Sequence, residues 1–195
     1  MTTRQATIER TTKETAIKAT LCLAPGDANI STGIGFLDHL LTALATHARI
    51  SLHLSAKGDL HIDDHHTAED CAIVLGKALD AALADRRGIA RFGSAYAPLD
   101  ESLARAVVDL SGRASAVVQL DLRRPMLGAL ACENISHFVQ TLACNARAAI
   151  HLDVLRGEND HHKAEATFKA LALALRQAIA IEGDSIPSTK GVLAS

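Results

Sequence analysis

The sequence predicts an α+β protein with two sheets, built from two copies of one half-domain. Alternating runs typical of strands and longer amphipathic runs typical of helices follow one another in both halves of the chain. The segment 64–69 reads Asp-His-His-x-Ala-Glu, and residues 160–165 repeat it. A duplication explains both observations, and we expect the two halves to cover residues 1–91 and 92–195 within one compact domain.

The first half is expected to contain a hairpin, two helices and a further strand. Alternation predicts strands over residues 6–10 and 14–23, joined by a turn that leaves Glu14 at its end. A flexible glycine loop then precedes a helix over residues 36–48, which carries His39 in its first turns. Residues 50–56 alternate and predict a strand, and residues 65–84 predict a second helix.

The second half is expected to repeat this content from about residue 92. Residues 103–109 and 114–122 alternate, and Ser111-Gly112 between them predicts a hairpin with Arg113 at its turn. Helices are expected over residues 133–149 and 165–180, with a strand over residues 150–155 between them. Pro187 excludes a helix in the polar tail.

Composition and charge allow a folded enzyme but argue against a large anionic partner. The chain has 195 residues, 48% of them hydrophobic, which is enough for a core without disulfides. Its 20 Lys and Arg against 22 Asp and Glu give a formal net charge of -2, so we expect no binding to nucleic acid or membrane. The sequence has neither a long apolar run nor a signal-peptide core, which predicts a cytoplasmic protein.

Two histidine clusters are the candidate functional residues. His65 and Glu69 are four residues apart, as are His161 and Glu165, so on a helix each pair projects from one face. The duplication adds one histidine upstream of each cluster. The full set of candidate metal ligands is His39, His65, His66, Glu69, His137, His161, His162 and Glu165.

These ligand types indicate divalent metal ions. Nitrogen and oxygen donors without thiolate suit Mn(II), Fe(II), Co(II) or Zn(II). The set suffices for two ions with three histidines and one glutamate each, which favours six-coordinate Mn(II) over a tetrahedral structural zinc. Which ligand serves which ion stays open. Asp38, Asp64 and Asp160 each precede a candidate ligand, and they are either acceptors that orient imidazoles or helix N-caps.

A second set of residues could bind an anionic group. Arginine offers two parallel hydrogen bonds to a phosphate and lysine a point charge, while neighbouring hydroxyls add donors. Taken alone, each of these cations is more often an ordinary surface residue. The set is Arg91, Arg113, Lys169, Ser188, Thr189 and Lys190.

Six motifs run in order across nearly the whole chain: Thr32–His39, Asp64–Asp70, Pro98–Glu101, Asp109–Arg113, Gly157–His162 and Ile186–Gly191. Together they closely resemble the imidazoleglycerol-phosphate dehydratase family. The resemblance implies a fold like domain 2 of ribosomal protein S5, with four helices sandwiched between two four-stranded mixed sheets. It also implies a homo-oligomer of 24 subunits with sites between subunits. We expect a monofunctional protein, because the sequence shows no fused phosphatase domain. Leu40 and Val139 depart from the family pattern, but neither is a candidate ligand.

The resemblance also implies a reaction and a role for each candidate. The family dehydrates D-erythro-imidazole glycerol phosphate to imidazole acetol phosphate in L-histidine biosynthesis, with two Mn2+ ions, or other divalent ions, in each active site. Its metal ligands fall on the eight residues named above. Its substrate contacts fall on Glu14 and on the cationic set, with Thr189 as an added donor. A dimetal-bound imidazolate is expected as the intermediate, with Glu14 as general acid and base. A metal-bound water or a ligand carboxylate, Glu69 or Glu165, competes for that role.

Two other functions fit the histidine clusters. A binuclear metallohydrolase would use the same ligands to activate water. A metal-storage or scaffold protein would only sequester ions or join subunits, and it would leave Glu14 and the cations without a task. Formation of the dehydration product with and without Mn2+ separates the three functions.

Overall fold

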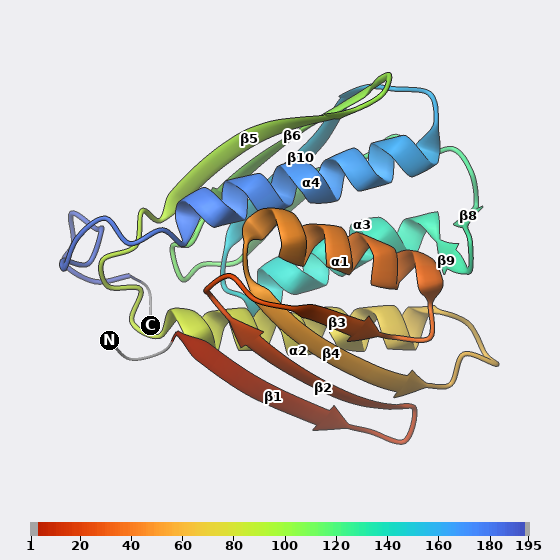
Figure 1. Ribbon diagram of the computed structural model, residues 1–195, viewed down its shortest axis with the longest axis horizontal. Coiled ribbons are helices and arrows are strands. Elements are labelled where there is room, and N and C mark those ends of the chain that lie inside the picture. The colour runs from red at the N-terminus through yellow and green to blue at the C-terminus, as the bar shows by residue number, and fades with distance from the viewer. Residues whose placement is uncertain (1–3, 194–195) are drawn as a thin grey trace.

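Two four-stranded sheets enclose four helices in this structure, a computed structural model that describes residues 4–193 (Figure 1). The two sheets form the outer layers, and all four helices lie between them. Residues 1–3 and 194–195, at the outer ends of the two expected halves, lie outside the described part of the chain. The α+β sandwich with two mixed sheets is therefore confirmed.

The first half runs strand, strand, strand, helix, strand, helix. Its elements are β1 (Gln5–Thr11), β2 (Thr15–Cys22), β3 (Ala28–Ser31), α1 (Gly35–Ala48), β4 (Ser51–Gly58) and α2 (His65–Leu83). The sheet order is β1-β2-β4-β3, and β3 is parallel to β4 while the other pairs are antiparallel. The expected hairpin of β1 and β2 is present, whereas β3 was not predicted.

The second half repeats this order with one small insertion. Its elements are β5 (Phe92–Leu99), β6 (Ser102–Asp109), β7 (Ser115–Gln119), β8 (Met126–Leu127), β9 (Leu130–Ala131), α3 (Cys132–Asn145), β10 (Ala149–Arg156) and α4 (Asp160–Ala178). The sheet order β5-β6-β10-β7, with β7 parallel to β10, matches the first sheet strand for strand. The topology confirms the duplicated fold, and the boundary at residues 91 and 92 stays a prediction.

The hairpin predicted from residues 103–109 and 114–122 is wrong. β10 lies between β6 and β7, so these two strands do not pair with each other. β6 instead forms a hairpin with β5, in which Leu99 pairs with Ser102. No glycine marks this turn, because Asp100 itself adopts the left-handed conformation, with φ 46°.

Two helix boundaries also differ from the prediction. α3 ends at Asn145, because Ala149 already begins β10. α4 begins at Asp160 rather than at Glu165, and the side chain of Asn159 caps it by accepting a hydrogen bond from the backbone N–H of His161. His161 and His162 therefore lie in the first turn of α4, as His65 and His66 do in α2.

The helices of one half pack against the helices of the other. α1 packs on α4, and α2 packs on α3. The approach of α2 to α3 requires Gly76, because a methyl group there would lie 2.8 Å from the carbonyl oxygen of Leu142. Within residues 4–193, no helix is long and apolar enough to cross a membrane. The contacts between halves bring His39 of α1 beside the first turns of α4, and His137 of α3 beside the first turns of α2.

Candidate metal centres

The first candidate centre lies between α1 and α4. The His39 Nε2 atom is 2.9 Å from Glu165 Oε2, and the His161 Nε2 atom is 3.3 Å from the same oxygen. One ligand atom from each of the three side chains lies within 4.8 Å of the other two. His161 and Glu165 meet because they are one helical turn apart in α4, and packing of α1 on that turn supplies His39.

The second candidate centre repeats this arrangement between α2 and α3. The His137 Nε2 atom is 3.0 Å from Glu69 Oε1, and the His65 Nε2 atom is 4.0 Å from Glu69 Oε2. The rings of His65 and His137 are stacked, with centroids 5.0 Å apart. Each centre therefore combines two ligands from one half of the chain with one from the other half.

The donor sets of both centres fit a divalent cation. Each has two imidazole nitrogens and a carboxylate, and their ligand atoms already converge within 4.8 Å. The Nδ1 atom of His65 lies 2.9 Å from Asn134 Oδ1, which directs the Nε2 atom toward Glu69. These contacts make His39, His161 and Glu165 one candidate ligand set and His65, Glu69 and His137 the other.

His66 and His162 lie outside both centres in the single chain. His66 Nδ1 is 3.0 Å from Asp59 Oδ2, and His162 Nδ1 is 2.7 Å from Glu101 Oε2. The hydrogen bond to Asp59 raises the pKa of His66, and the one to Glu101 raises the pKa of His162. The structure thus brings together six of the eight predicted ligands and holds the other two by carboxylates.

Lys169 lies at the first centre rather than with the other predicted cations. Its Nζ atom is 2.8 Å from Glu165 Oε1. Burial alone would raise the pKa of Glu165, but the hydrogen bonds from Lys169 and His39 outweigh it and lower that pKa to about 2. Glu165 is therefore a carboxylate at any physiological pH, as a metal ligand requires.

The remaining predicted anion-binding residues gather in one cavity of about 350 Å³. Residues that line it include Arg91, Arg113, Ser188, Thr189 and Lys190. Arg91 is committed to the protein, because its guanidinium forms two hydrogen bonds with Asp109 and one with the carbonyl of Pro187. Within the described residues, the side chains of Arg113 and Lys190 form no ion pair, so their charges are available to a ligand.

This cavity and the metal centres lie at opposite ends of α4. His161 and Glu165 lie in its first two turns, whereas the backbone N–H of Arg91 donates to the carbonyl of Ala178 at its other end. At about 1.5 Å per residue, the helix covers about 20 Å between Glu165 and Ala178. A small molecule cannot contact both regions of one chain.

Glu14 is an uncommitted carboxylate in the turn between β1 and β2. Within residues 4–193, its side chain has no hydrogen bond or ion pair, and its charge adds to the effect of Asp59 in raising the pKa of His66. The hairpin itself is anchored, because the Asp70 carboxylate accepts hydrogen bonds from Arg10 and Thr15. Glu14 is thus held near His66 on a fixed turn.

The acceptors that hold the imidazoles were not predicted. Asp59, Glu101 and Asn134 contact imidazole Nδ1 atoms, and only Glu101 lies within a motif that the sequence singled out. Hydrogen bonds to the carboxylate lower the pKa of Glu101, first among them that from His162. No local sequence pattern identifies these three residues as partners of histidines, because each contacts its histidine only in the tertiary fold.

In the described part of the chain, none of the aspartates that precede the ligands contacts an imidazole, and only Asp64 occupies an N-cap position, where its side chain forms no capping hydrogen bond. Asp38 accepts from the N–H and hydroxyl of Thr32, and Asp64 accepts from the N–H of Ala131. Asp160 accepts from the N–H groups of Arg123 and Arg124. These carboxylates fasten loops to the helix starts because their oxygens face the incoming backbone rather than the imidazoles.

The fold and the two centres define a class of duplicated α+β proteins that carry paired histidine and glutamate sites between their halves. The imidazoleglycerol-phosphate dehydratase family matches residues 32–175. The dehydratase of Chlorobium luteolum is 54% identical over 191 residues, which cover 97% of this chain and 96% of that protein. The dehydratase of Phytophthora nicotianae is 58% identical over 193 residues, but they cover only 43% of its length against 98% of this chain.

Solved structures agree with the sequence matches. The dehydratase of Pyrococcus furiosus, in complex with (S)-C348, superposes with a TM-score of 0.83 at 39% identity over 95% of this chain and 100% of that chain. The enzyme of Staphylococcus aureus gives the same TM-score at 36% identity, over 91% of this chain and 99% of that one. The chain belongs to the imidazoleglycerol-phosphate dehydratase family. It is a hydro-lyase of histidine biosynthesis.

Proposed function

We propose that this chain dehydrates D-erythro-imidazole glycerol phosphate to imidazole acetol phosphate with two divalent ions, Mn2+ foremost, in each active site. The observation that carries the proposal is the pair of matching centres, each with two imidazoles and a carboxylate within 4.8 Å. His39, His161 and Glu165 would hold one ion, and His65, Glu69 and His137 the other. His66 and His162 would complete the two sets in the assembled protein.

The reaction needs an electron sink, because the carbon that loses its proton has no adjacent carbonyl. Two bound ions would supply positive charge that stabilises the imidazole ring of the substrate as imidazolate. Glu14 would accept the proton from the carbon and, as general acid, return it to the departing hydroxide, which leaves as water. The enol that results becomes the ketone by moving a proton from oxygen to carbon. Glu69 and Glu165 are alternatives for these transfers, but both are engaged with histidines.

Recognition of the phosphate falls to the cationic cavity. Arg113 and Lys190 supply unpaired positive charge, and Ser188 and Thr189 supply hydroxyl donors. Arg91 holds the C-terminal tail in place through the carbonyl of Pro187. Lys169, paired with Glu165, would contact the substrate close to the first ion.

The distance between these parts supports assembly of the active site from several subunits. The cavity lies about 20 Å along α4 from Glu165, which is too far for one small substrate to bridge. We therefore propose a homo-oligomer in which the phosphate cavity of one subunit faces the metal centres of another, with the 24 subunits that the family resemblance implies. We place it in the cytoplasm, because all four cysteines are free thiols, as is usual in a reducing compartment.

The experiment compares wild type with E14Q in an ultraviolet assay of product formation, with and without Mn2+. The substitution should reduce turnover by about two to four orders of magnitude, the usual contribution of a general acid or base. Its metal content should be unchanged. Glu9, on β1 of the same hairpin and paired with Lys18, provides the matched control E9Q, which should keep normal turnover.

Near-normal turnover of E14Q would remove Glu14 from the mechanism. Release of inorganic phosphate instead of dehydration would point to a metallohydrolase. Binding of Mn2+ without any turnover by the wild-type chain would point to metal storage.

A further inference from the structure

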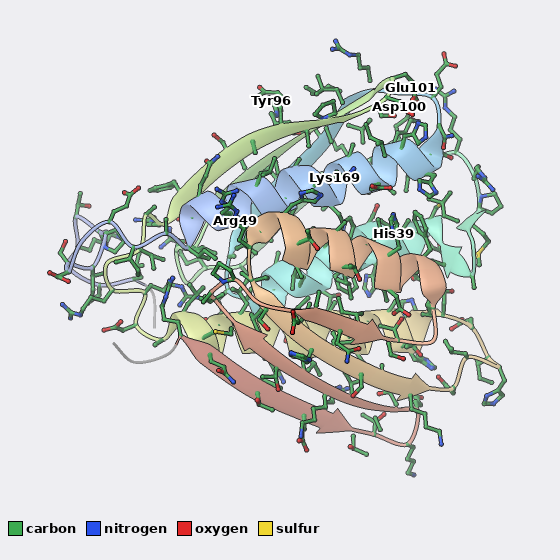
Figure 2. All side chains as sticks on the ribbon, viewed as in Figure 1. His39, Arg49, Tyr96, Asp100, Glu101 and Lys169 are labelled. Atoms are coloured by element: carbon green, nitrogen blue, oxygen red, sulfur yellow. The ribbon has the colours of Figure 1, made fainter. Side chains whose placement is uncertain are left out.

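Glu101 holds both a backbone loop and an imidazole with one carboxylate. Its Oε1 atom accepts hydrogen bonds from the N–H groups of Glu158 and Asn159, at 3.1 and 2.9 Å, and from the hydroxyl of Ser102 at 3.0 Å. Its Oε2 atom lies 2.7 Å from His162 Nδ1. Figure 2 shows Glu101 at the tip of the β5–β6 hairpin, beside the start of α4.

This arrangement determines which nitrogen of His162 carries the proton. An ionised carboxylate only accepts hydrogen bonds, so the Nδ1 atom at 2.7 Å must be the donor. In the neutral ring the Nε2 atom then keeps its lone pair, which is the form that binds a metal ion. The opposite tautomer would place the proton on the nitrogen that a metal requires.

We propose that Glu101 is a positioning residue that fixes the tautomer of His162 and so presents its Nε2 atom to a divalent ion. The proposal rests on the metal-dependent function proposed above, because His162 acts on the substrate only through such an ion. Glu101 itself contacts neither ion nor substrate.

The duplication gives Glu101 a counterpart in the first half of the chain. Glu101 directly precedes Ser102, which packs against Gly157, so a methyl group on that glycine would meet the Ser102 hydroxyl. Glu14 directly precedes Thr15, which pairs with Gly58 in the equivalent place. Glu14 and Glu101 are therefore the same position of the repeat.

The two copies differ in which carboxylate holds the imidazole. In the first half, Asp59 lies 3.0 Å from His66 Nδ1 and performs this task. Glu14 is thereby released from the histidine and remains uncommitted within the described chain. In the second half the equivalent glutamate, Glu101, is not free for another role, because it holds His162.

The substitution E101Q tests the tautomer without dismantling the loop. Three donors face the Oε1 position, so the amide oxygen of glutamine must take that place. The amide NH2 then faces His162 Nδ1 and can only donate to it. The ring is forced to carry its proton on Nε2, and metal binding is lost there while the loop keeps its hydrogen bonds.

Asp59 provides a contrasting variant. Its Oδ1 atom is buried and accepts no hydrogen bond within the described residues. In D59N the amide nitrogen can occupy that position while the oxygen still accepts from His66. E158Q is the charge control, because it removes one negative charge from the same loop and the Glu158 side chain takes no part in these contacts.

The measurement is Mn2+ binding to the full-length chain, followed by electron paramagnetic resonance of the free ion, together with the melting temperature. E101Q should bind Mn2+ about 10- to 100-fold more weakly, the usual effect of losing a partner of a metal-binding histidine. D59N should lose much less Mn2+ affinity than E101Q, and E158Q should bind Mn2+ as tightly as wild type. The melting temperature of chelated E101Q should stay within a few degrees of wild type.

A second measurement reads the tautomer without metal. Nitrogen-15 shifts of histidine-labelled, chelated protein distinguish a protonated from a bare ring nitrogen, and one histidine should change from the Nδ1–H to the Nε2–H form in E101Q. Wild-type Mn2+ affinity in E101Q, equal losses in E101Q and D59N, or an unchanged tautomer would overturn the proposal. A melting temperature of chelated E101Q far below that of wild type would also overturn the proposal, because it would show that Glu101 serves only to stabilise the loop. Failure of the wild-type chain to bind Mn2+ would refute the metal function, and the nitrogen-15 shifts would still decide the tautomer.

Discussion

Lys163, in the first turn of α4, forms an ion pair that is sealed from solvent. Its side chain is 1% exposed, and its Nζ atom lies 3.3 Å from Oδ1 of Asp160, whose side chain is 2% exposed. The ammonium also donates to the carbonyl of Asp121 at 2.6 Å. K163M keeps the apolar stem and removes the charge, so we expect it to destabilise the chain strongly.

The size of the effect follows from what Asp160 keeps. Removal of one partner from a buried pair costs about 3–5 kcal/mol, because the other charge is left uncompensated. Oδ2 of Asp160 retains its two backbone donors, Arg123 and Arg124, so we take the lower end, about 3 kcal/mol. For a domain of this size, that loss corresponds to a fall in Tm of about 6–12 °C.

Urea unfolding of the chelated protein at one fixed chain concentration measures this loss. The double variant K163M/D160N should lose at least about 1 kcal/mol less than the sum of the single variants, because, among the described residues, the only carboxylate it leaves without Lys163 is that of Asp121, whose side chain is 69% exposed. The control K18M breaks the exposed pair with Glu9 and should cost about 0–1 kcal/mol. A K163M cost no larger than that of K18M, or full additivity in the double variant, would refute the reasoning.

Three further predictions concern the cavity, the first centre and the assembly. R113M and K190M should each raise KM about tenfold or more through the loss of a charge-assisted hydrogen bond, with unchanged Mn2+ content; a changed content at normal KM would contradict this. Because the pKa of Glu165 is lowered to about 2, below about 4.3 for a free glutamate, its contribution to stability is complete above about pH 4.3 and is lost as the pH falls through 2. The urea midpoints of chelated wild type and E165Q should therefore converge only in acid, and a constant difference would contradict it. Chelation should shrink the particle in sedimentation, because ligands shared between subunits couple metal binding to assembly; an unchanged particle would contradict that coupling.

Local sequence patterns predicted the helices and strands of this fold better than they predicted which strands pair with each other. The β1–β2 hairpin followed from two alternating runs with a short turn between them. β3 escaped because it has only four residues, most of them exposed, and β5 because small residues, glycine and proline weaken its strand character. The error in the second half had a different cause, since alternation identifies a strand but not its neighbour, and β10 comes between β6 and β7 only through the long-range path of the chain.

The candidate site shows the same limit. Spacing predicted that Glu69 and Glu165 would each lie one turn from a histidine, and both do. It left open which upstream histidine joins which cluster, because that depends on the packing of α1 on α4 and of α3 on α2. Spacing could not indicate that Asp59 and Glu101 hold imidazoles, because the sequence around a carboxylate does not show which distant side chain it will contact.

The crossed composition of the centres has a consequence for the origin of the chain. His39 of the first half completes a centre of the second half, and His137 of the second half completes a centre of the first. Neither half alone can assemble a centre, yet two identical halves related by a two-fold axis would form both at once. A gene for a single half-domain would therefore have encoded a working pair of centres as a homodimer. Fusion of two such genes would then let the copies diverge, so that one hairpin glutamate holds a histidine while its counterpart does not.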